Sequence, residues 1–347
     1  MELTSLVRVL VVDDSAYVRK VVTQMLTRSP FIEVVGTARD GREALELTVE
    51  KRPNVITCDL NMPEMDGVAF VREQMLRSPI PIIIISVASP SGDQVLAALE
   101  AGAIDFLQKP TALASDRLME MGEQLVEKVK AAALAPMRRR PALVEPGPAA
   151  ARVVRLGDGH CDVVVIGIST GGPQGLKLVI PRLPVDLPVP VGIVLHMPIG
   201  YTEIYAKKLD ELSELLVKEA QHGDAVAPGV VLLAPAGRHM SFRRVGAAVT
   251  VHLDIRPLDK PHRPAVDVLF HSAAECFGSR SLGVIMTGMG TDGLEGSAWI
   301  KAKGGRILTE AEESCVVYGM PRAVDEAGLS NGRIPLEMMA DAIMEHL

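Results

Sequence analysis

Aromatic residues are scarce in this sequence, and their scarcity favours one class of fold. Phe, Trp and Tyr make up only 3% of the 347 residues, whereas 48% of the chain is hydrophobic. Val, Ile, Leu and Ala must therefore fill the core, as they do in α/β proteins with buried parallel strands. A chain of this length exceeds the usual size of one hydrophobic core, so we expect two domains.

Cysteine is scarce as well, and the four cysteines are scattered singly at positions 58, 161, 276 and 315. No CxxC pair occurs, which argues against a disulfide framework and against a zinc site. Reduced thiols in a cytoplasmic protein explain this pattern better.

Long apolar runs are missing too. None reaches the length of about 18–20 residues that a membrane span needs. The N-terminal stretch lacks the basic start and the cleavage site of a signal peptide. We therefore expect a soluble, cytoplasmic protein without membrane insertion. The formal net charge of −7 argues against a nucleic-acid surface as its main function.

The first part of the chain alternates short apolar runs with helical patterns. The expected strands cover residues 8–12, 31–37, 54–59, 81–85 and 104–107. A helical pattern follows each of them, the last at residues 116–133. This alternation predicts a doubly wound parallel sheet, which binds ligands outside the carboxyl ends of its strands.

Polar side chains stand at those strand ends, and they should converge in one pocket: Asp13, Asp14, Asp59, Ser86 and Lys109. Crowded carboxylates repel one another and are normally paired or metal-bound. An all-oxygen set without His or Cys indicates Mg²⁺, and a lysine and a hydroxyl beside it suit a phosphoryl group. The alternative, a carboxylate that only caps the next helix, is plausible for Asp13 or Asp59 alone.

These residues resemble a response-regulator receiver domain, with the Asp pair at 13–14, DLNMPEMDG around Asp59, Ser86 and Lys109-Pro110 in the family's order. The resemblance implies a flavodoxin-like fold in which Asp59 accepts a phosphoryl group from a sensor histidine kinase. It also implies that Mg²⁺ is held by Asp13, Asp14, Asp59 and the backbone carbonyl of Asn61.

Three further roles follow from the same resemblance. Ser86 and Lys109 would contact the phosphoryl oxygens, with a cis bond at Lys109-Pro110. Phe106 lies where such domains carry an aromatic residue that reports the phosphorylation state. Ser rather than Thr at position 86 is a departure, but either hydroxyl can donate a hydrogen bond.

Prolines at 136, 141, 146 and 148 end the helical pattern. Three arginines at 138–140 are more typical of a solvated linker than of a nucleic-acid patch in an acidic chain. We therefore expect a receiver domain at 1–134, a Pro/Arg/Ala-rich linker at 135–160 and a catalytic domain at 161–347.

The last part of the chain is a second, larger α/β unit. Its expected strands include residues 163–168, 190–195, 230–234, 282–286 and 306–308, with a hairpin at 243–251. Helices are expected at about 202–216, 265–277 and 335–345, and Pro173 opens another.

Ser169, His196 and Asp292 each lie on a loop directly after one of these strands. If the strands are parallel neighbours, the three residues share one edge of the sheet. A serine nucleophile needs a histidine to take its proton and a carboxylate to orient that histidine. The chain order is unusual for a hydrolase and no GxSxG motif occurs, so spacing alone leaves the triad open.

Several simpler interpretations compete with the triad. Ser169 would cap the helix that follows it, His196 would bond a backbone carbonyl, and Asp292 would form an Asx turn or cap a helix at 293–302. Other histidines compete for the role of base: His222, His239, His262 and His271. GISTGG also faintly resembles a dinucleotide loop, but it lacks the GxGxxG spacing.

Six motifs, in this order behind a receiver, resemble the chemotaxis protein-glutamate methylesterase family: IGISTGGP, HMPIGYT, APAGRHM, HRPAVDVLF, TGMGTDG and SCVVYGMPRAV. The match spans nearly the whole chain except the linker. It implies that Ser169 is the nucleophile, His196 the general base and Asp292 the residue that orients it. Thr170, Gly171 and Met289 would lie at the oxyanion site, and the family's usual HMPPG is HMPIG here.

The resemblance also implies substrate and regulation. The enzyme would hydrolyse glutamate γ-methyl esters on chemoreceptors and deamidate glutamines, as a monomer and without a cofactor for the ester chemistry. The receiver would inhibit it until Asp59 is phosphorylated. A DNA-binding response regulator is the main rival, but residues 161–347 show no basic helix-turn-helix pattern. A docking module that has lost its chemistry is another.

Overall fold

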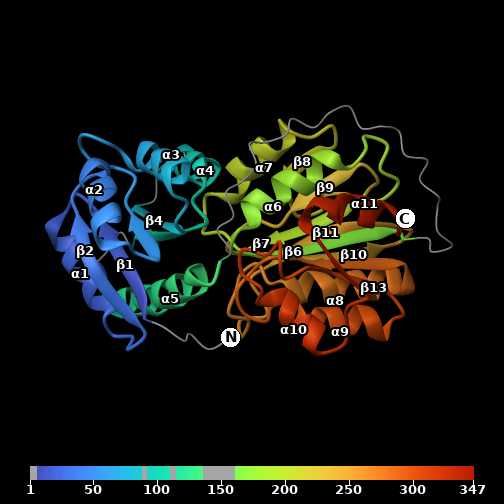
Figure 1. Ribbon diagram of the computed structural model, residues 1–347. Helices are drawn as coiled ribbons and strands as arrows, with labels where there is room; N and C mark the ends of the chain where they lie inside the picture. The colour runs from blue at the N-terminus through green and yellow to red at the C-terminus, as the bar shows by residue number, and fades with distance from the viewer. Residues whose placement is uncertain (1–5, 88–91, 110–114, 136–160) are drawn as a thin grey trace. The chain divides into compact units, whose positions relative to one another are not determined.

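A computed structural model describes residues 6–87, 92–109, 115–135 and 161–347. Contacts divide the chain into two compact units, Met1–Arg139 and Arg140–Leu347 (Figure 1). The expected domain limits at 134/135 and 160/161 stay predictions, because residues 136–160 lie outside the described part.

The first unit is a five-stranded parallel sheet in the order β2-β1-β3-β4-β5. Its strands are β1 (Val7–Val12), β2 (Ile32–Ala38), β3 (Val55–Cys58), β4 (Ile82–Val87) and β5 (Asp105–Lys109). Its helices are α1 (Ala16–Leu26), α2 (Gly41–Lys51), α3 (Gly67–Arg77), α4 (Asp93–Ala101) and α5 (Ser115–Ala133). The doubly wound fold expected from the sequence is confirmed.

Caps fix where the helices of this unit begin. Ser15 accepts a hydrogen bond from the backbone N–H of Val18 at the start of α1, and Asp66 accepts one from Ala69 in α3. The strand order reverses at β1, which pairs with both β2 and β3. Ligands of such sheets bind at this switch point, beyond the carboxyl ends of the strands.

The second unit has a seven-stranded parallel sheet in the order β14-β13-β12-β6-β7-β9-β8, and a separate antiparallel pair. The strands of the sheet are β6 (Val163–Ile168), β7 (Val191–Leu195), β8 (Leu216–Glu219), β9 (Val230–Leu233), β12 (Ser281–Ile285), β13 (Arg306–Glu310) and β14 (Gly332–Ile334). The pair is β10 (His239–Val245) and β11 (Ala248–Asp254). The α-helices are α6 (Gly172–Val179), α7 (Thr202–Asp210), α8 (Val266–Phe277), α9 (Leu294–Ala302), α10 (Met320–Glu326) and α11 (Met339–Met344).

Helix α8 packs directly on β6 near its carboxyl end. A Cβ added at Gly167 would lie 2.3 Å from Cγ1 of Val266, so only glycine allows this approach. Val266 belongs to one buried apolar cluster with Val165, Leu269 and Phe270. The close approach places the first turn of α8 beside the residues that follow β6.

One helix expected in the second unit has the wrong extent. The helix expected at 202–216 ends at Asp210, and β8 follows. Asp210 accepts a hydrogen bond from the backbone N–H of Val217 at 2.7 Å, which aligns the new edge strand. The sequence patterns missed α10 and β14, and the helix expected at 335–345 is a 3-10 turn (Leu336–Met338) followed by α11.

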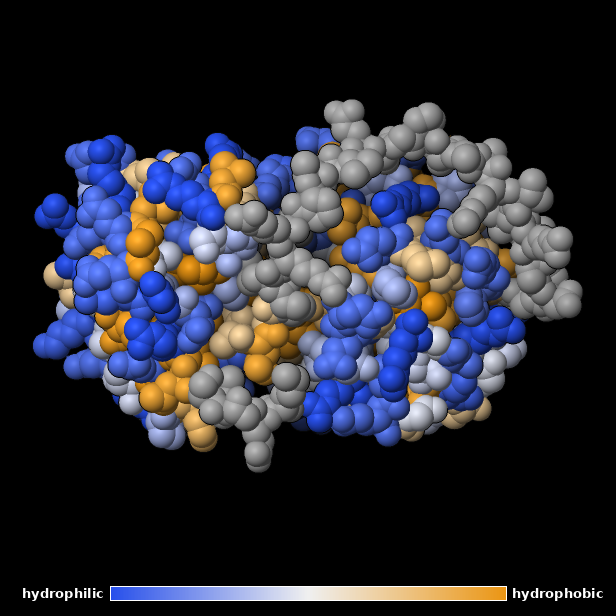
Figure 2. Space-filling model, in the orientation of Figure 1, coloured by the Kyte–Doolittle hydropathy of each residue, from blue (hydrophilic) through white to orange (hydrophobic). Residues whose placement is uncertain are grey.

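The surface view in Figure 2 shows a mainly hydrophilic face, with apolar residues gathered in separate patches. Among the residues that the structure describes, no helix has both the length and the apolar character that crossing a membrane requires.

Candidate functional sites

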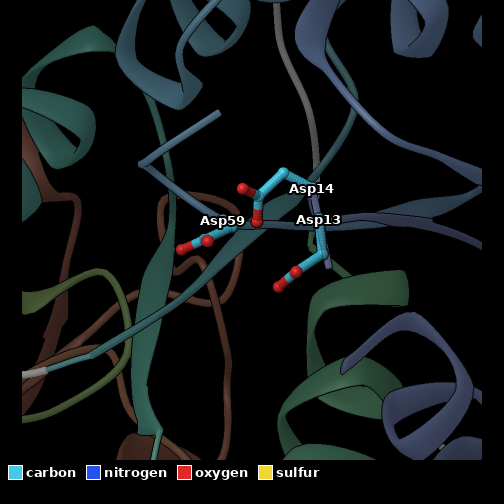
Figure 3. Close-up of side chains that lie close together, drawn as sticks. All are labelled: Asp13, Asp14 and Asp59. Carbon is cyan, nitrogen blue, oxygen red and sulfur yellow. The ribbon is translucent and has the colours of Figure 1, made fainter. Parts of the chain in front are cut away.

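Three carboxyl groups meet at the switch point of the first unit. Asp13 and Asp14 follow β1, and Asp59 follows β3 (Figure 3). One carboxylate oxygen from each lies within 4.8 Å of the others. Asp13 and Asp59 are buried and Asp14 is exposed, so the cluster opens to the surface on the Asp14 side.

Lys109, the last residue of β5, bridges the two buried carboxylates. Its Nζ lies 2.6 Å from Oδ2 of Asp13 and 3.0 Å from Oδ2 of Asp59. Burial raises the pKa of Asp59 above its ordinary value, although Lys109 opposes this shift. Burial also disfavours the ammonium group, but the bonds to Asp13 and Asp59 outweigh it and raise the pKa of Lys109. One cation therefore balances two buried anions incompletely.

This donor set fits a hard divalent cation. Magnesium prefers oxygen ligands and is commonly held by one or two carboxylates, with phosphate oxygens and water completing its shell. A second positive charge would also relieve the repulsion between Asp13 and Asp59. Asn61 is exposed in the turn after β3, on the same edge of the sheet, and its carbonyl role stays a prediction.

The remaining receiver residues lie on neighbouring strands. Ser86 is buried in β4 and pairs in register with Gln108 of β5, directly before Lys109. Phe106 is buried in β5. Pro110 lies outside the described residues, and with it the expected cis bond.

In the second unit, strand register makes Ser169 and His196 neighbours. Ile168 of β6 pairs with Leu195 of β7, and each of the two residues follows its strand directly. The backbone N–H of His196 also donates to the carbonyl of Ile168 at 3.2 Å. The shared edge expected from the sequence is therefore present.

Asp292 comes from the loop after β12 and meets the histidine ring. Oδ2 of Asp292 lies 2.8 Å from Nε2 of His196. The carboxylate also accepts the backbone N–H groups of Val266 at 2.8 Å and Asp267 at 3.0 Å. Burial would raise the pKa of Asp292, but these three hydrogen bonds outweigh it and lower that pKa. Asp292 is a fixed carboxylate.

The other ring nitrogen of His196 is buried and has no hydrogen-bond partner among the described residues. In a neutral ring, Nε2, which faces a carboxylate, carries the proton, and Nδ1 is left with its lone pair. This is the protonation state that a general base needs. The alternative that His196 bonds a backbone carbonyl is wrong.

Ser169 does not cap a helix. The N-cap of α6 is Gly171, with φ of 81°, and no side-chain hydrogen bond is made there. The Ser169 backbone is instead tied at both ends: its N–H donates to the carbonyl of Thr287 at 3.0 Å, and its carbonyl accepts from Gly172 at 2.7 Å. The backbone turn is held without using the hydroxyl, so the capping interpretation is wrong.

The loop after β12 packs against this turn. A Cβ at Gly288 would lie 2.8 Å from Cβ of Ser169, so the contact needs glycine. Thr287 donates its hydroxyl to the carbonyl of Thr170 at 3.0 Å. Met289 follows Gly288 directly, which places its backbone near Ser169. The oxyanion roles of Thr170, Gly171 and Met289 stay predictions.

The competing histidines have other environments. His239 is buried with both nitrogens engaged, Nε2 to the carbonyl of Pro257 and Nδ1 to the N–H of Ala265. Burial lowers the pKa of His239, which favours its neutral form. His262 stacks on His196, with ring centroids 4.1 Å apart. His222 accepts from the N–H of Leu253, and His271 lies edge-on to Trp299.

Sequence reasoning missed two carboxylates that support these loops. Glu310 is fully buried at the end of β13 and accepts the N–H of Thr287 at 2.8 Å. Burial raises its pKa to about 7. Asp267, in the first turn of α8, accepts the N–H of Gly293 at 2.9 Å. In the sequence, each of the two is simply an acidic residue within a helix or a strand, and nothing else marks it as a support for the loops around Ser169 and His196.

Comparisons with known proteins assign a family to each part of the chain. Residues 164–343 match the family model described as CheB methylesterase, and residues 9–122 match the response regulator receiver domain. A protein-glutamate methylesterase/protein-glutamine glutaminase of Myxococcus xanthus is 46% identical over 348 residues, 100% of both chains. One from Symbiobacterium thermophilum is 45% identical, over 97% of this chain and 96% of its own.

One solved structure supports the fold of the second unit. The methylesterase catalytic domain of Thermotoga maritima CheB is 41% identical with a TM-score of 0.53, covering 54% of this chain and 99% of that one. The family model spans more than half of the residues, and the relatives match over nearly the full length. The chain belongs to the CheB methylesterase family and carries a response regulator receiver domain in front of it.

Proposed function

We propose that this protein hydrolyses glutamate γ-methyl esters on chemotaxis receptors and deamidates receptor glutamines, under control of its receiver domain. One observation carries the chemistry: His196 is held by Asp292 through Nε2 while its buried Nδ1 is unpaired, on the sheet edge that it shares with Ser169. The names of the full-length relatives supply the substrate class.

The reaction begins with attack by Oγ of Ser169 on the ester carbonyl, as Nδ1 of His196 takes the hydroxyl proton. Asp292 stabilises the imidazolium that forms. His196 then returns the proton to the leaving methoxide, so methanol departs and an acyl-serine remains. Water attacks the acyl group by the same path and releases the glutamate carboxylate. With a glutamine substrate, ammonia leaves instead.

The oxyanion of each tetrahedral intermediate needs N–H donors that are already in place. The turn at Thr170 and Gly171 and the backbone of Met289 would supply them, both beside Ser169. One such donor contributes roughly 3–4 kcal/mol to the lowering of the barrier. The hydrogen bonds of Thr287 and Glu310 would keep this loop in position.

The receiver would control this chemistry through Asp59, which accepts a phosphoryl group from a sensor histidine kinase. Lys109 and Ser86 would bind the phosphoryl oxygens, and Asp13, Asp14 and the carbonyl of Asn61 would hold Mg²⁺. The ion supplies positive charge that phosphoryl transfer onto a carboxylate requires. Phe106 would report the modified state. About 1.4 kcal/mol of differential stability changes an inhibited population tenfold.

Methanol release from receptor carrying radiolabelled methyl esters tests the proposal. Full-length protein with a small-molecule phosphodonor and Mg²⁺ should release methanol, and Ser169→Ala should abolish the release while the chain stays folded. Ser213→Ala, a serine of the same unit far along the chain from the turn, is the matched control and should retain activity. Turnover by Ser169→Ala would refute the triad.

The same assay separates the rivals. A docking module would release no methanol in any state. A DNA-binding output is not favoured, because the described residues of the second unit form a parallel α/β sheet. A chain beginning near Arg152 should be more active than the unphosphorylated full-length protein, and equal activities would count against inhibition by the receiver.

A further inference from the structure

Two helices beside the triad begin without a cap of their own. The N-cap of α8 is Ala265 and that of α9 is Gly293, and neither makes a side-chain hydrogen bond. The first backbone N–H groups of a helix have no partner within the helix. Both helix starts are buried against the active edge, so these N–H groups need acceptors from elsewhere.

The two helices exchange acceptors. Asp292, which precedes α9, accepts the N–H groups of Val266 and Asp267 in the first turn of α8 at 2.8 and 3.0 Å. Asp267 in turn accepts the N–H groups of Gly293 and Gly296 with its Oδ1, at 2.9 and 2.8 Å. We call these four hydrogen bonds the reciprocal cap.

We propose that Asp267 is a positioning residue for the esterase reaction, which holds Asp292 in the orientation that His196 requires. The inference rests on the triad under Proposed function. Oδ2 of Asp292 is shared between Nε2 of His196 and the N–H of Val266. A shift of the loop relative to α8 would change that oxygen's position. Asp267 opposes the shift because it accepts a hydrogen bond from the N–H of Gly293, the residue next to Asp292.

Both carboxylates of this arrangement lie close to positive charge. Each carboxylate faces the N-terminus of the other's helix, where the helix dipole favours negative charge. Oδ2 of Asp267 is also 3.0 Å from Nζ of Lys260, which contacts Glu295 in addition. Hydrogen bonds from backbone N–H groups and one lysine therefore surround the two carboxylates.

Glycine at both donor positions permits this contact. Gly293 has φ of 97°, in the left-handed region, and a Cβ there would lie 2.5 Å from Cδ1 of Ile285. A Cβ at Gly296 would lie 2.5 Å from Cβ of Phe270 and 3.0 Å from Cα of Asp267. Helices α8 and α9 therefore lie in close contact at Gly296. The side chain of Asp267 in α8 is long enough to reach the N–H groups at the start of α9.

The test compares Asp267→Ala with Asp267→Asn in the full-length chain, activated by phosphodonor and Mg²⁺. Asparagine keeps an oxygen acceptor for both glycine N–H groups, whereas alanine removes it. We expect kcat to fall about 100-fold in the alanine variant with KM little changed, because a displacement of about 1 Å in an active site can cost that much. The asparagine variant should recover to within about tenfold of the unchanged protein.

A spectroscopic readout separates positioning from general stability. The proton that Nε2 of His196 shares with Asp292 should give a downfield NMR resonance. We expect that resonance to disappear or shift in Asp267→Ala and to return in Asp267→Asn. Glu295→Gln is the matched control, because Glu295 contacts Lys260 but no N–H of the reciprocal cap, and it should change neither readout. If the alanine variant does not fold, Asp267→Ser, whose hydroxyl is too short to reach both glycines, replaces it.

The outcomes distinguish this inference from the proposed function. Wild-type kcat and an unchanged resonance in the alanine or serine variant would overturn the positioning role, as would equal losses in the alanine and asparagine variants. Full turnover by Ser169→Ala would instead overturn the triad itself, whatever the Asp267 variants do.

Discussion

Two buried carboxylates, Asp59 in the first unit and Asp292 in the second, lie at equivalent places, beyond the carboxyl ends of parallel strands. Their surroundings differ. Asp59 shares one lysine with Asp13, and burial raises its pKa. Asp292 is met by two backbone N–H groups and a histidine, and these hydrogen bonds lower its pKa despite burial.

The difference shows how one type of sheet edge gives two buried carboxylates different surroundings. Asp292 has its hydrogen-bonding capacity filled from within the unit, so it can orient His196 but is poorly suited to react itself. Asp59 is buried and shares a single lysine with Asp13, so its ionised form gains from an added cation. The carboxylate proposed to react shares a single cation with its neighbour, whereas the carboxylate proposed to orient a histidine accepts hydrogen bonds from three donors.

Replacing Asp292 should give the largest effect, because it removes the carboxylate proposed to orient His196 and leaves Asp59 untouched. Asp292→Asn keeps the size of the side chain but turns an ionised acceptor into a neutral amide. We expect kcat for methanol release to fall by about 10⁴-fold, the size of loss seen when a triad carboxylate is neutralised. Phosphorylation of the receiver, followed with a radiolabelled phosphodonor, should be unchanged. A fall of less than about tenfold would show that His196 does not depend on this carboxylate.

Replacing Asp59 should break the other side of the comparison with a smaller effect. Asp59→Asn removes the phosphoryl acceptor, so the activation by phosphodonor should vanish while the basal rate of ester hydrolysis remains. We expect a loss of about tenfold or more, since each 1.4 kcal/mol of bias toward the active state is tenfold. Removal of Mg²⁺ by a chelator should give the same result without mutation. If the chelator also lowered the basal rate, the metal would have a role outside the acidic pocket.

Much of this arrangement could be predicted from the sequence, because the candidate site residues of both units stand at strand ends. Asp13 and Asp59 stand directly after apolar runs, as do Ser169 and His196, and parallel strands bring such residues to one edge. The sequence patterns failed before β8, a short edge strand: the helix expected to reach Leu216 ends at Asp210.

The supporting carboxylates were not accessible for a different reason. Asp267 and Glu310 lie within a helix and a strand, where an acidic residue normally faces solvent. Their partners are backbone N–H groups 26 and 23 residues away along the chain. A backbone N–H has no residue signature, so only the folded arrangement reveals which N–H groups these two carboxylates accept.

Replacing Glu310 should give the smallest effect of the three. Glu310 combines features of Asp59 and Asp292: it accepts a backbone N–H as Asp292 does, yet burial raises its pKa, here to about 7. Protonation is favoured in the folded state, so the stability it contributes is present below its ordinary value near 4.5 and is lost as pH rises through about 7. Ser314, Cys315 and Glu337 also face this group, and Glu337 adds to the upward shift.

Glu310→Gln removes the titration. The free energy of unfolding of the second unit is measured with urea in the full chain, for the variant and for wild type. The difference between them should shift in favour of the variant by about 2 kcal/mol as the pH rises from about 5.5 to about 8. A difference between variant and wild type that stays constant over this range would show that Glu310 titrates as an ordinary glutamate, and that the hydrogen bond from Thr287 fully compensates for its burial.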